Sequence, residues 1–426
     1  MSEMTNRLQA LELYAQLYEE WGAKDVEALL AAVDAAIGKA LAALHGSAVD
    51  AALAAREPDE FAAIKALRPK ASSRMHVRLS ATALREKLGG AMLARFAGCT
   101  LGAIVEGWPV ARMEKWAALT GDAFPPVDYW SRANSPEEIR YGMSPQKSYT
   151  RSEMDGFPVD DDITYTLIGL LIAEKYGVDF TVGDVGKAWL DWLPIACTAE
   201  DIALKNLKKG ISAERAAEID NPFCQWIGAA IRSDPWGYLA AGWPEKAAEF
   251  AWRDAYLSHR RNGIYGEMYL AAAQAAAFAT ETSEEALRVG LEEIPENCAL
   301  ADDIRWALDI ASSTEDWREA RARVDGRFGA MSHVHTNNNL CLVALGLLLG
   351  GRDVTKVLGE VVAMGMDNDC TAASAGSIVG AIVGASGIPG QWTRGVNNKV
   401  YSYINGYPVF AIDDLVERFA AVNEKL

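Results

Sequence analysis

The 426-residue chain carries a net charge of −17 with no compensating stripe of lysine and arginine, which excludes nucleic acid as its main partner. Its longest apolar runs, residues 340–349 and 375–385, are shorter than the roughly 18 residues that a membrane span needs, so no membrane association is expected. Six scattered cysteines without a CxxC pair, and a polar start at residues 1–7 without a signal-peptide core, predict a soluble cytoplasmic protein with reduced thiols.

Helical periodicity runs along almost the whole chain, with apolar residues three and four positions apart. Residues 6–45 predict two helices with a break near residues 22–25. Further helices are predicted at about residues 87–103, 161–176, 181–193, 199–209, 213–218, 245–257, 267–281, 284–292, 299–311, 315–323, 339–350, 354–364, 371–384 and 411–424. Because alternating β patterns are scarce, we expect an all-α fold with an N-terminal helical extension (residues 1–86) and a larger helical domain (residues 87–426).

Residues 104–158 are rich in Pro, Gly, Trp and Tyr and predict a long, ordered loop system. A loop of that length within a compact domain is usually functional.

Two acidic clusters are the most informative motifs. Asp160, Asp161 and Asp162 open one apolar segment, and Asp367 and Asp369 open another. Buried carboxylates without partners are costly, and a hard divalent cation such as Mg²⁺, Ca²⁺ or Mn²⁺ removes that cost. The competing interpretation is that these are ordinary helix N-caps and first-turn charges. Two such clusters on separate helices favour one metal site assembled by the fold.

Three glycines recur every four residues at Gly376, Gly380 and Gly384. Glycine inside a helix costs about 1 kcal/mol, so a structural reason is expected. We expect this face to pack closely against another helix and to hold the second acidic cluster at the centre of the bundle.

These motifs resemble the ADP-ribosylglycohydrolase family of all-α, Mg²⁺-dependent enzymes, over residues 87–395. The segment Gly98–Glu106 is similar to the family's early Gly-Asp-x-x-Gly-x-x-x-Glu motif. The segment Asp160–Leu167 is similar to its Thr-Asp-Asp-Thr helix start, and Asp367–Gly376 to its Gly-Asp-Thr-Asp-Thr/Ser motif. The resemblance implies a compact, orthogonal multi-helix bundle with a binuclear metal site at helix N-termini.

The resemblance also implies roles for single residues. Two Mg²⁺ ions, with Mn²⁺ as a possible substitute, would be bound by both acidic clusters. Asp160 stands where the family usually has a threonine ligand. Glu106 matches a loop glutamate that contributes to catalysis or substrate positioning, and we take Glu106 and Asp161 as the candidate catalytic carboxylates. The candidate metal ligands are Asp160, Asp161, Asp162, Asp367 and Asp369.

Two cysteines depart from the family pattern. Cys99 stands where an aspartate is common, and Cys370 stands where a Thr or Ser hydroxyl normally binds metal. A thiolate is a soft ligand that suits Mg²⁺ poorly. Either Cys370 is not a ligand or one metal position is altered, and whether Cys370 or Thr371 contacts metal stays open.

Two other polar segments are candidates for binding substrate. His335 precedes Asn337, Asn338 and Asn339 at an expected helix start, where one asparagine would cap the helix and the others would bind ribose hydroxyls or organise the metal cluster. In the second segment, Gly263 and Gly266 flank Tyr265 and predict a tight loop whose aromatic ring stacks on a base or ribose.

We therefore expect a metal-dependent hydrolase that cleaves an ADP-ribosyl or ribosyl glycosidic bond, with a water attacking the anomeric carbon. One alternative keeps the metal site but takes a small ribosylated metabolite or a nucleoside as substrate. Another is a non-catalytic protein that binds ADP-ribose or a nucleotide. The acceptor, the anomer, the role of the N-terminal extension and the oligomeric state are not fixed by the sequence.

Overall fold

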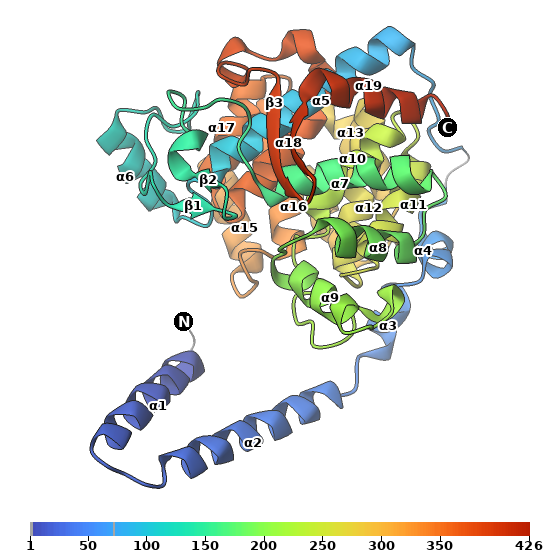
Figure 1. Cartoon of the computed structure of the whole chain (residues 1–426). Coiled ribbons are helices and arrows are strands. Elements are labelled where there is room, and N and C mark those ends of the chain that lie inside the picture. Colours follow the sequence, from blue (N-terminus) through green and yellow to red (C-terminus); the bar gives the residue numbers. More distant parts are fainter. Residues whose placement is uncertain (1–2, 71–72) are drawn as a thin grey trace. The chain divides into compact units, whose positions relative to one another are not determined.

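The computed structural model describes residues 3–70 and 73–426, which divide into two compact units between residues 55 and 56. Helices dominate both units (Figure 1), and the strands of the described residues form only two small hairpins. The expected all-α fold class is confirmed. None of the described helices combines the length and the apolar composition that a membrane crossing requires.

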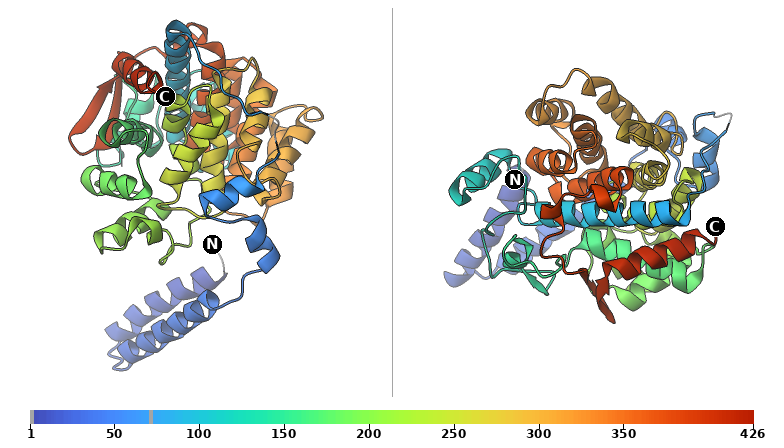
Figure 2. Two further views of the ribbon diagram at one scale, coloured as in Figure 1. Left: turned by 90° about the vertical axis from the view of Figure 1, so that its right-hand side faces the viewer. Right: turned by 90° about the horizontal axis from the view of Figure 1, so that it is seen from above.

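The first unit contains a helical hairpin. Helix α1 (Glu3–Glu20) and helix α2 (Val26–His45) lie side by side in the left view of Figure 2, and α3 (Ala51–Arg56) follows at the end of the unit. The break expected at residues 22–25 falls between α1 and α2. Two helices enclose little space between them, so large apolar side chains such as Trp21 and Leu44 stay exposed.

The second unit begins at Arg56. Residues 56–80, which the sequence assigns to the N-terminal extension, contain α4 (Phe61–Leu67) and contact later helices of this unit. Arg74 forms an ion pair with Glu293 at 2.8 Å, and the indole of Trp252 donates to the carbonyl of Asp59 at 2.8 Å. The division into an extension of residues 1–86 and a domain of residues 87–426 stays a prediction.

The remaining helices follow in chain order. They are α5 (Ala81–Ala103), α6 (Val110–Thr120), α7 (Asp161–Tyr176), α8 (Val182–Trp192), α9 (Thr198–Lys208), α10 (Asp234–Leu239), α11 (Pro244–Ala255), α12 (Asn262–Ala277), α13 (Ser283–Leu291), α14 (Ala299–Ala311), α15 (Trp317–Phe328), α16 (Thr336–Gly350), α17 (Val354–Met364), α18 (Asn368–Val383) and α19 (Ile412–Asn423). Strands β1 (Ile139–Arg140) and β2 (Ser144–Pro145) pair antiparallel, as do β3 (Lys399–Ile404) and β4 (Tyr407–Ala411).

Helices α5 and α18 pack backbone to backbone at the centre of the second unit (Figure 1). A Cβ atom added at Gly380 would lie 2.2 Å from the carbonyl oxygen of Gly90, and one at Gly376 would lie 2.3 Å from that of Ala94. Real Cβ atoms do not approach backbone so closely, so only glycine fits. The expected helix packing of the glycines at 376 and 380 is confirmed. The partner helix is α5, which carries Gly98 and Gly102 of the segment Gly98–Glu106.

The same packing fixes the start of α18. A Cβ atom at Gly102, in the last turn of α5, would lie 2.4 Å from the Cα atom of Asp369. Every residue of the neighbouring helix α12 is buried, so the helix pair rests on an alanine-rich core. The backbone of Asp369 is therefore held by the core of the second unit.

The region 104–158 contains more regular structure than the sequence predicts. Helix α6 begins after Pro109 and ends at Gly121, whose φ of +74° is left-handed. The region also contains a short 3-10 helix (Gln146–Tyr149) and the hairpin β1–β2, whose turn has left-handed φ values at Tyr141 (+51°) and Gly142 (+69°). This hairpin carries Arg140 toward the N-termini of α7 and α18.

Candidate active site

The first acidic cluster opens α7. Asp160 is the N-cap, and its carboxylate accepts a hydrogen bond from the backbone N–H of Asp162 at 3.2 Å. Asp160 and Asp162 are fully buried. The helix-capping interpretation of Asp160 is thus correct, but it satisfies only one oxygen of one carboxylate. Capping alone does not account for three acids at this position.

The second acidic cluster opens α18. Asp367 stands at the cap position without a side-chain capping bond, and its backbone N–H donates to Asn339 at 3.2 Å. Met366 has a left-handed φ of +66°, so the chain turns sharply into the helix. Asp367 and Asp369 are both buried.

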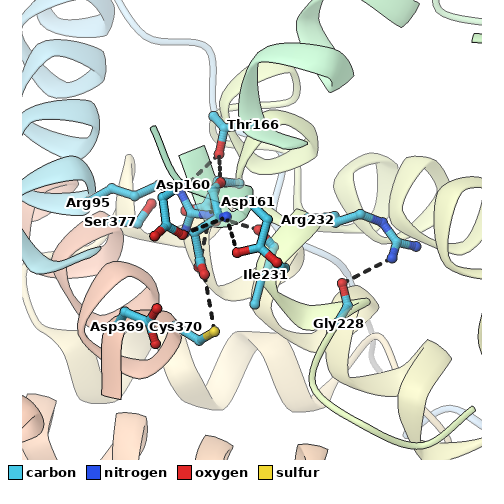
Figure 3. Close-up of polar contacts among 12 residues, drawn as sticks. Arg95, Asp160, Asp161, Thr166, Gly228, Ile231, Arg232, Asp369, Cys370 and Ser377 are labelled. Atoms are coloured by element: carbon cyan, nitrogen blue, oxygen red, sulfur yellow. Dashed lines mark hydrogen bonds and ion pairs between the residues drawn. The ribbon is translucent and has the colours of Figure 1, made fainter. Parts of the chain in front are cut away.

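The fold brings the two clusters together (Figure 3), with Asp369 and Cys370 of α18 facing the start of α7. Oxygen atoms of Glu106, Asp367 and Asp369 lie within 4.8 Å of one another. A second group with the same spacing joins Asp162 to Asp369 and Cys370. Carboxylates from α7, α18 and the turn after α5 therefore converge on one point, as expected for a single polar centre.

A cavity of about 140 Å³ opens onto this centre. Its lining includes the acidic residues Glu106, Asp161, Asp367 and Asp369, together with Glu200 and the segment 226–228. Asp160 and Asp162 lie deeper and do not reach the cavity. Of the five candidate metal ligands, three are thus open to a small molecule.

Burial dominates the electrostatics of the cluster. Burial, together with the negative charges of neighbouring carboxylates, raises the pKa of Asp367 to about 7 and that of Asp160 to about 8. The guanidinium of Arg140 opposes the shift at Asp160. Neighbouring acids with such pKa values require protons or a cation to be stable near neutral pH.

The donor atoms fit a hard divalent cation. Asp369 is 2 % exposed, and its Oδ1 atom is buried without any hydrogen-bond partner. An unpartnered carboxylate oxygen next to two further carboxylates is what Mg²⁺ or Mn²⁺ would satisfy. Carboxylate clusters that can hold metal are therefore present.

The Cys370 thiol makes a hydrogen bond within the cluster. It donates to Asp162 Oδ2 at 3.1 Å, and burial raises its pKa well above the usual range. The Cys370 thiol thus serves as a hydrogen-bond donor to this carboxylate.

A buried arginine supports the base of the cluster. Arg95 of α5 is fully buried, donates to the backbone carbonyl of Asp162 at 2.8 Å and lies 3.5 Å from its carboxylate. It also donates to Thr166 at 2.9 Å, one turn along α7. Arg95 thereby fixes the first turn of α7 against α5.

Sequence reasoning missed several residues of the site, and two of them come from the hairpin β1–β2. The hydroxyl of Tyr141 donates to Asp161 Oδ1 at 2.7 Å, and Nη2 of Arg140 lies 3.1 Å from Asp160 and 3.0 Å from Glu106. Arg140 is the last residue of strand β1, and Tyr141 follows it in the turn of the hairpin β1–β2. The only signal in the sequence was the length and composition of the region 104–158, which indicates function without naming a residue.

The four polar residues at the start of α16 do not line the cavity. The His335 side chain caps the helix by accepting from the N–H of Asn337, so the expectation that an asparagine caps it was wrong. The side-chain amides of Asn337, Asn338 and Asn339 donate to Asp303, to the carbonyl of Ser332, and to the carbonyls of His333 and His335. Asn339 alone contacts the acidic centre, through the backbone of Asp367.

Gly263, Tyr265 and Gly266 do not form the expected loop. They lie in the first turns of α12, where a Cβ at Gly266 would be 2.3 Å from Thr336. The Tyr265 hydroxyl donates to the carbonyl of Pro58. Gly266 allows close packing against α16 and Gly263 allows close approach of the Cys224 carbonyl. The structure brings none of the three residues to the cavity, and their role in binding substrate stays an untested prediction.

The family model for ADP-ribosylglycohydrolase matches residues 80–425, which is most of the chain. The chain belongs to the ADP-ribosylglycohydrolase family. Membership implies a glycosyl hydrolase of the ADP-ribosylglycohydrolase type, acting on ADP-ribosylated substrates. A solved structure described as an "ADP-ribosylglycohydrolase-related protein complex" is 19% identical, with a TM-score of 0.48, covering 81% of this chain and 99% of that chain. A comparison with curated proteins found no match.

Proposed function

We propose that this protein is a Mg²⁺-dependent hydrolase, with Mn²⁺ as a substitute, that cleaves the glycosidic bond between an ADP-ribosyl or ribosyl group and an acceptor. The observation that carries this proposal is the convergence of Glu106, Asp367 and Asp369 within 4.8 Å at the cavity, with one oxygen of Asp369 left without a partner. Family membership supports the reaction type.

We assign the metal to the two acidic clusters. Asp161, Asp367 and Asp369 face the cavity, and Asp162 and Asp160 lie behind them. When bound, divalent ions clamp substrate oxygens and activate water. The α5–α18 contact holds the Asp369 backbone in place, so the ligand geometry is preorganised by helix packing.

Glu106 is the candidate proton-transfer group. Its side chain is 43 % exposed, it lies on the turn after α5, and it borders the cavity. An accessible carboxylate at this position can take a proton from attacking water. Asp161 also lines the cavity, with its carboxylate oriented by the Tyr141 hydroxyl, and can stabilise the positive charge that develops at the anomeric carbon.

The size of the cavity bears on the substrate. Pockets that enclose a drug-sized ligand measure about 300–1,000 Å³, and this cavity measures about 140 Å³. We expect the cavity to take the ribosyl group, with the acceptor and any diphosphate and adenine extending beyond it. This observation also favours the second candidate, the hydrolysis of a small ribosylated metabolite or a nucleoside.

The test is turnover of a substrate panel. Protein freed of metal is incubated with Mg²⁺, Mn²⁺ or chelator and with ADP-ribosyl-arginine peptide, ADP-ribosyl-serine peptide, ribosylated metabolites and nucleosides, and the products are identified by mass. Glu106→Gln should lower turnover by about 10²-fold or more while metal binding and folding persist. Asp369→Ala should lose both turnover and metal binding.

The matched control is Glu114→Gln. Glu114 is 40 % exposed and paired with Arg318, much as Glu106 is paired with Arg140, but it lies on α6 outside the cavity. Its turnover should equal that of the wild type. Equal rates in Glu106→Gln would remove this residue from the mechanism. A wild type that binds ADP-ribose but cleaves nothing on the panel would favour the non-catalytic binding protein.

A further inference from the structure

Arg140 places a positive charge inside the acidic centre. Its Nη2 atom lies 3.0 Å from Glu106 Oε2, 3.1 Å from Asp160 Oδ2 and 3.6 Å from Asp369 Oδ2. These three carboxylates come from the turn after α5, the N-cap of α7 and the first turn of α18. One guanidinium nitrogen therefore joins all three elements that build the centre.

The arginine is held firmly in this position. Its Nη1 atom donates to the carbonyl of Ala103 at 2.7 Å, which ties it to the end of α5. Its guanidinium carbon lies 5.4 Å from the ring centroid of Tyr141 and 5.7 Å from that of Tyr149. Only 16 % of its side chain is exposed. A planar, anchored guanidinium of this kind loses little entropy by pairing with carboxylates.

Arg140 and a metal ion cannot share the point between these carboxylates. A divalent ion would bind their oxygens at about 2.0–2.6 Å, and the guanidinium nitrogen already lies 3.0–3.6 Å from the same three acids. Two cations so close together would also repel each other strongly in a buried site. The position next to Asp160 that a metal ion could occupy is therefore filled by the Arg140 guanidinium.

The other side of the centre remains open to a cation. Asp369 Oδ1 has no partner, and Asp367 and Asp369 both face the cavity. Asp160 is the acid that stands where a threonine is expected from the family resemblance, so its additional negative charge is the one that Arg140 neutralises.

We infer that Arg140 takes the place of one of the two expected metal ions, so that this protein binds a single divalent ion on the Asp367–Asp369 side. This inference rests on the proposed metal dependence. It corrects the number of ions and makes Arg140 a permanent cation of the site, which also leaves Asp160 outside the ligand set.

The test counts ions without using activity. Chelator-treated full-length protein is titrated with Mn²⁺ by calorimetry, and the number of ions per chain is read independently from native mass and from the electron paramagnetic resonance spectrum, in which two Mn²⁺ sharing a carboxylate couple. The wild type should bind one uncoupled ion. Arg140→Ala should bind two, and Arg140→Lys, which keeps the charge, should bind one.

The matched control is Arg151→Ala. Arg151 lies in the same region and pairs with Asp122 at 2.9 Å, away from the acidic centre, so its variant should bind one ion. Two ions in the wild type, none in the wild type, or a single ion in folded Arg140→Ala would each overturn the inference. If Arg140→Ala fails to fold, the number of ions bound by the wild type still decides whether the inference holds. Two ions together with hydrolysis would leave the proposed function intact, whereas one ion without hydrolysis of the panel would refute that function alone.

Discussion

The contact between Gly102 and Asp369 predicts that one methyl group should damage both the core and the site. In Gly102→Ala, the new Cβ would lie 2.4 Å from the Asp369 Cα, whereas ordinary contact begins at 3.4 Å. Helices α5 and α18 must then separate by about 1 Å, and overpacking of this kind costs typically 1–3 kcal/mol. For a unit of about 370 residues this lowers the melting temperature by about 1–4 °C.

The same displacement moves a metal ligand. Metal–ligand bond lengths vary by only about 0.2 Å around their ideal values. A shift of about 1 Å at Asp369 should therefore weaken Mn²⁺ binding by at least tenfold, or about 1.4 kcal/mol. Urea unfolding measures the stability change, and calorimetric titration of the chelator-treated variant measures the affinity.

Two alanine variants separate the core from the site. In Gly380→Ala the Cβ would lie 2.2 Å from the carbonyl oxygen of Gly90, but about 16 Å along α18 from Asp369. It should lose similar stability and keep its Mn²⁺ affinity. Gly326 lies in α15 with nothing within 4 Å of an added Cβ, and Gly326→Ala should gain about 0.5–1 kcal/mol. A Gly102→Ala protein with wild-type stability and affinity, or a Gly380→Ala protein with equally weakened binding, would refute the reasoning.

Two further predictions concern the acidic centre. Because burial raises the folded-state pKa of Asp367 to about 7 and of Asp160 to about 8, the folded state holds more protons than the unfolded state between about pH 4 and 8, so the metal-free protein should lose stability as pH rises through this window. Thermal melts at pH 5 and pH 8 with chelator measure this loss, saturating Mg²⁺ should reduce it, and a chelated protein that is more stable at pH 8 would contradict it. Because the Cys370 thiol donates to Asp162, Cys370→Ser should retain or improve Mg²⁺ affinity in calorimetry; a clear loss would mean that the sulfur binds the metal.

The helical fold can be predicted from the sequence because apolar residues recur with helical periodicity. The meeting of the two acidic clusters can be predicted because their carboxylates are adjacent in the sequence and need a shared cation. The glycine repeat at residues 376–384 indicates a backbone contact, and its partner proves to be the other glycine-bearing helix. Short elements were not predicted. Helix α10 has only six residues, and the hairpin β3–β4 near the C-terminus shows no clear alternation of apolar and polar residues. Periodicity needs a longer window than such elements provide.

The residues around the cavity were harder to predict. Arg140 acts through contacts with residues far away in the chain, and a single arginine in an irregular segment has no pattern that marks it. The asparagines of α16 show the opposite error, since Asn337 and Asn338 are committed to Asp303 and to a backbone carbonyl. Polar residues at a helix start serve local backbone geometry as readily as they serve a ligand.

The pairing of α5 with α18 also has a consequence for biosynthesis. Residues 81–103 leave the ribosome long before residues 368–383, so the glycine face of α5 has no native partner while most of the chain is being made. A nascent chain in this state exposes apolar surface that invites aggregation or chaperone binding. A transcript truncated before the codon for residue 368 would encode a protein that lacks α18 and therefore the central helix pair. We expect such a protein to be degraded and not to accumulate as an inactive enzyme.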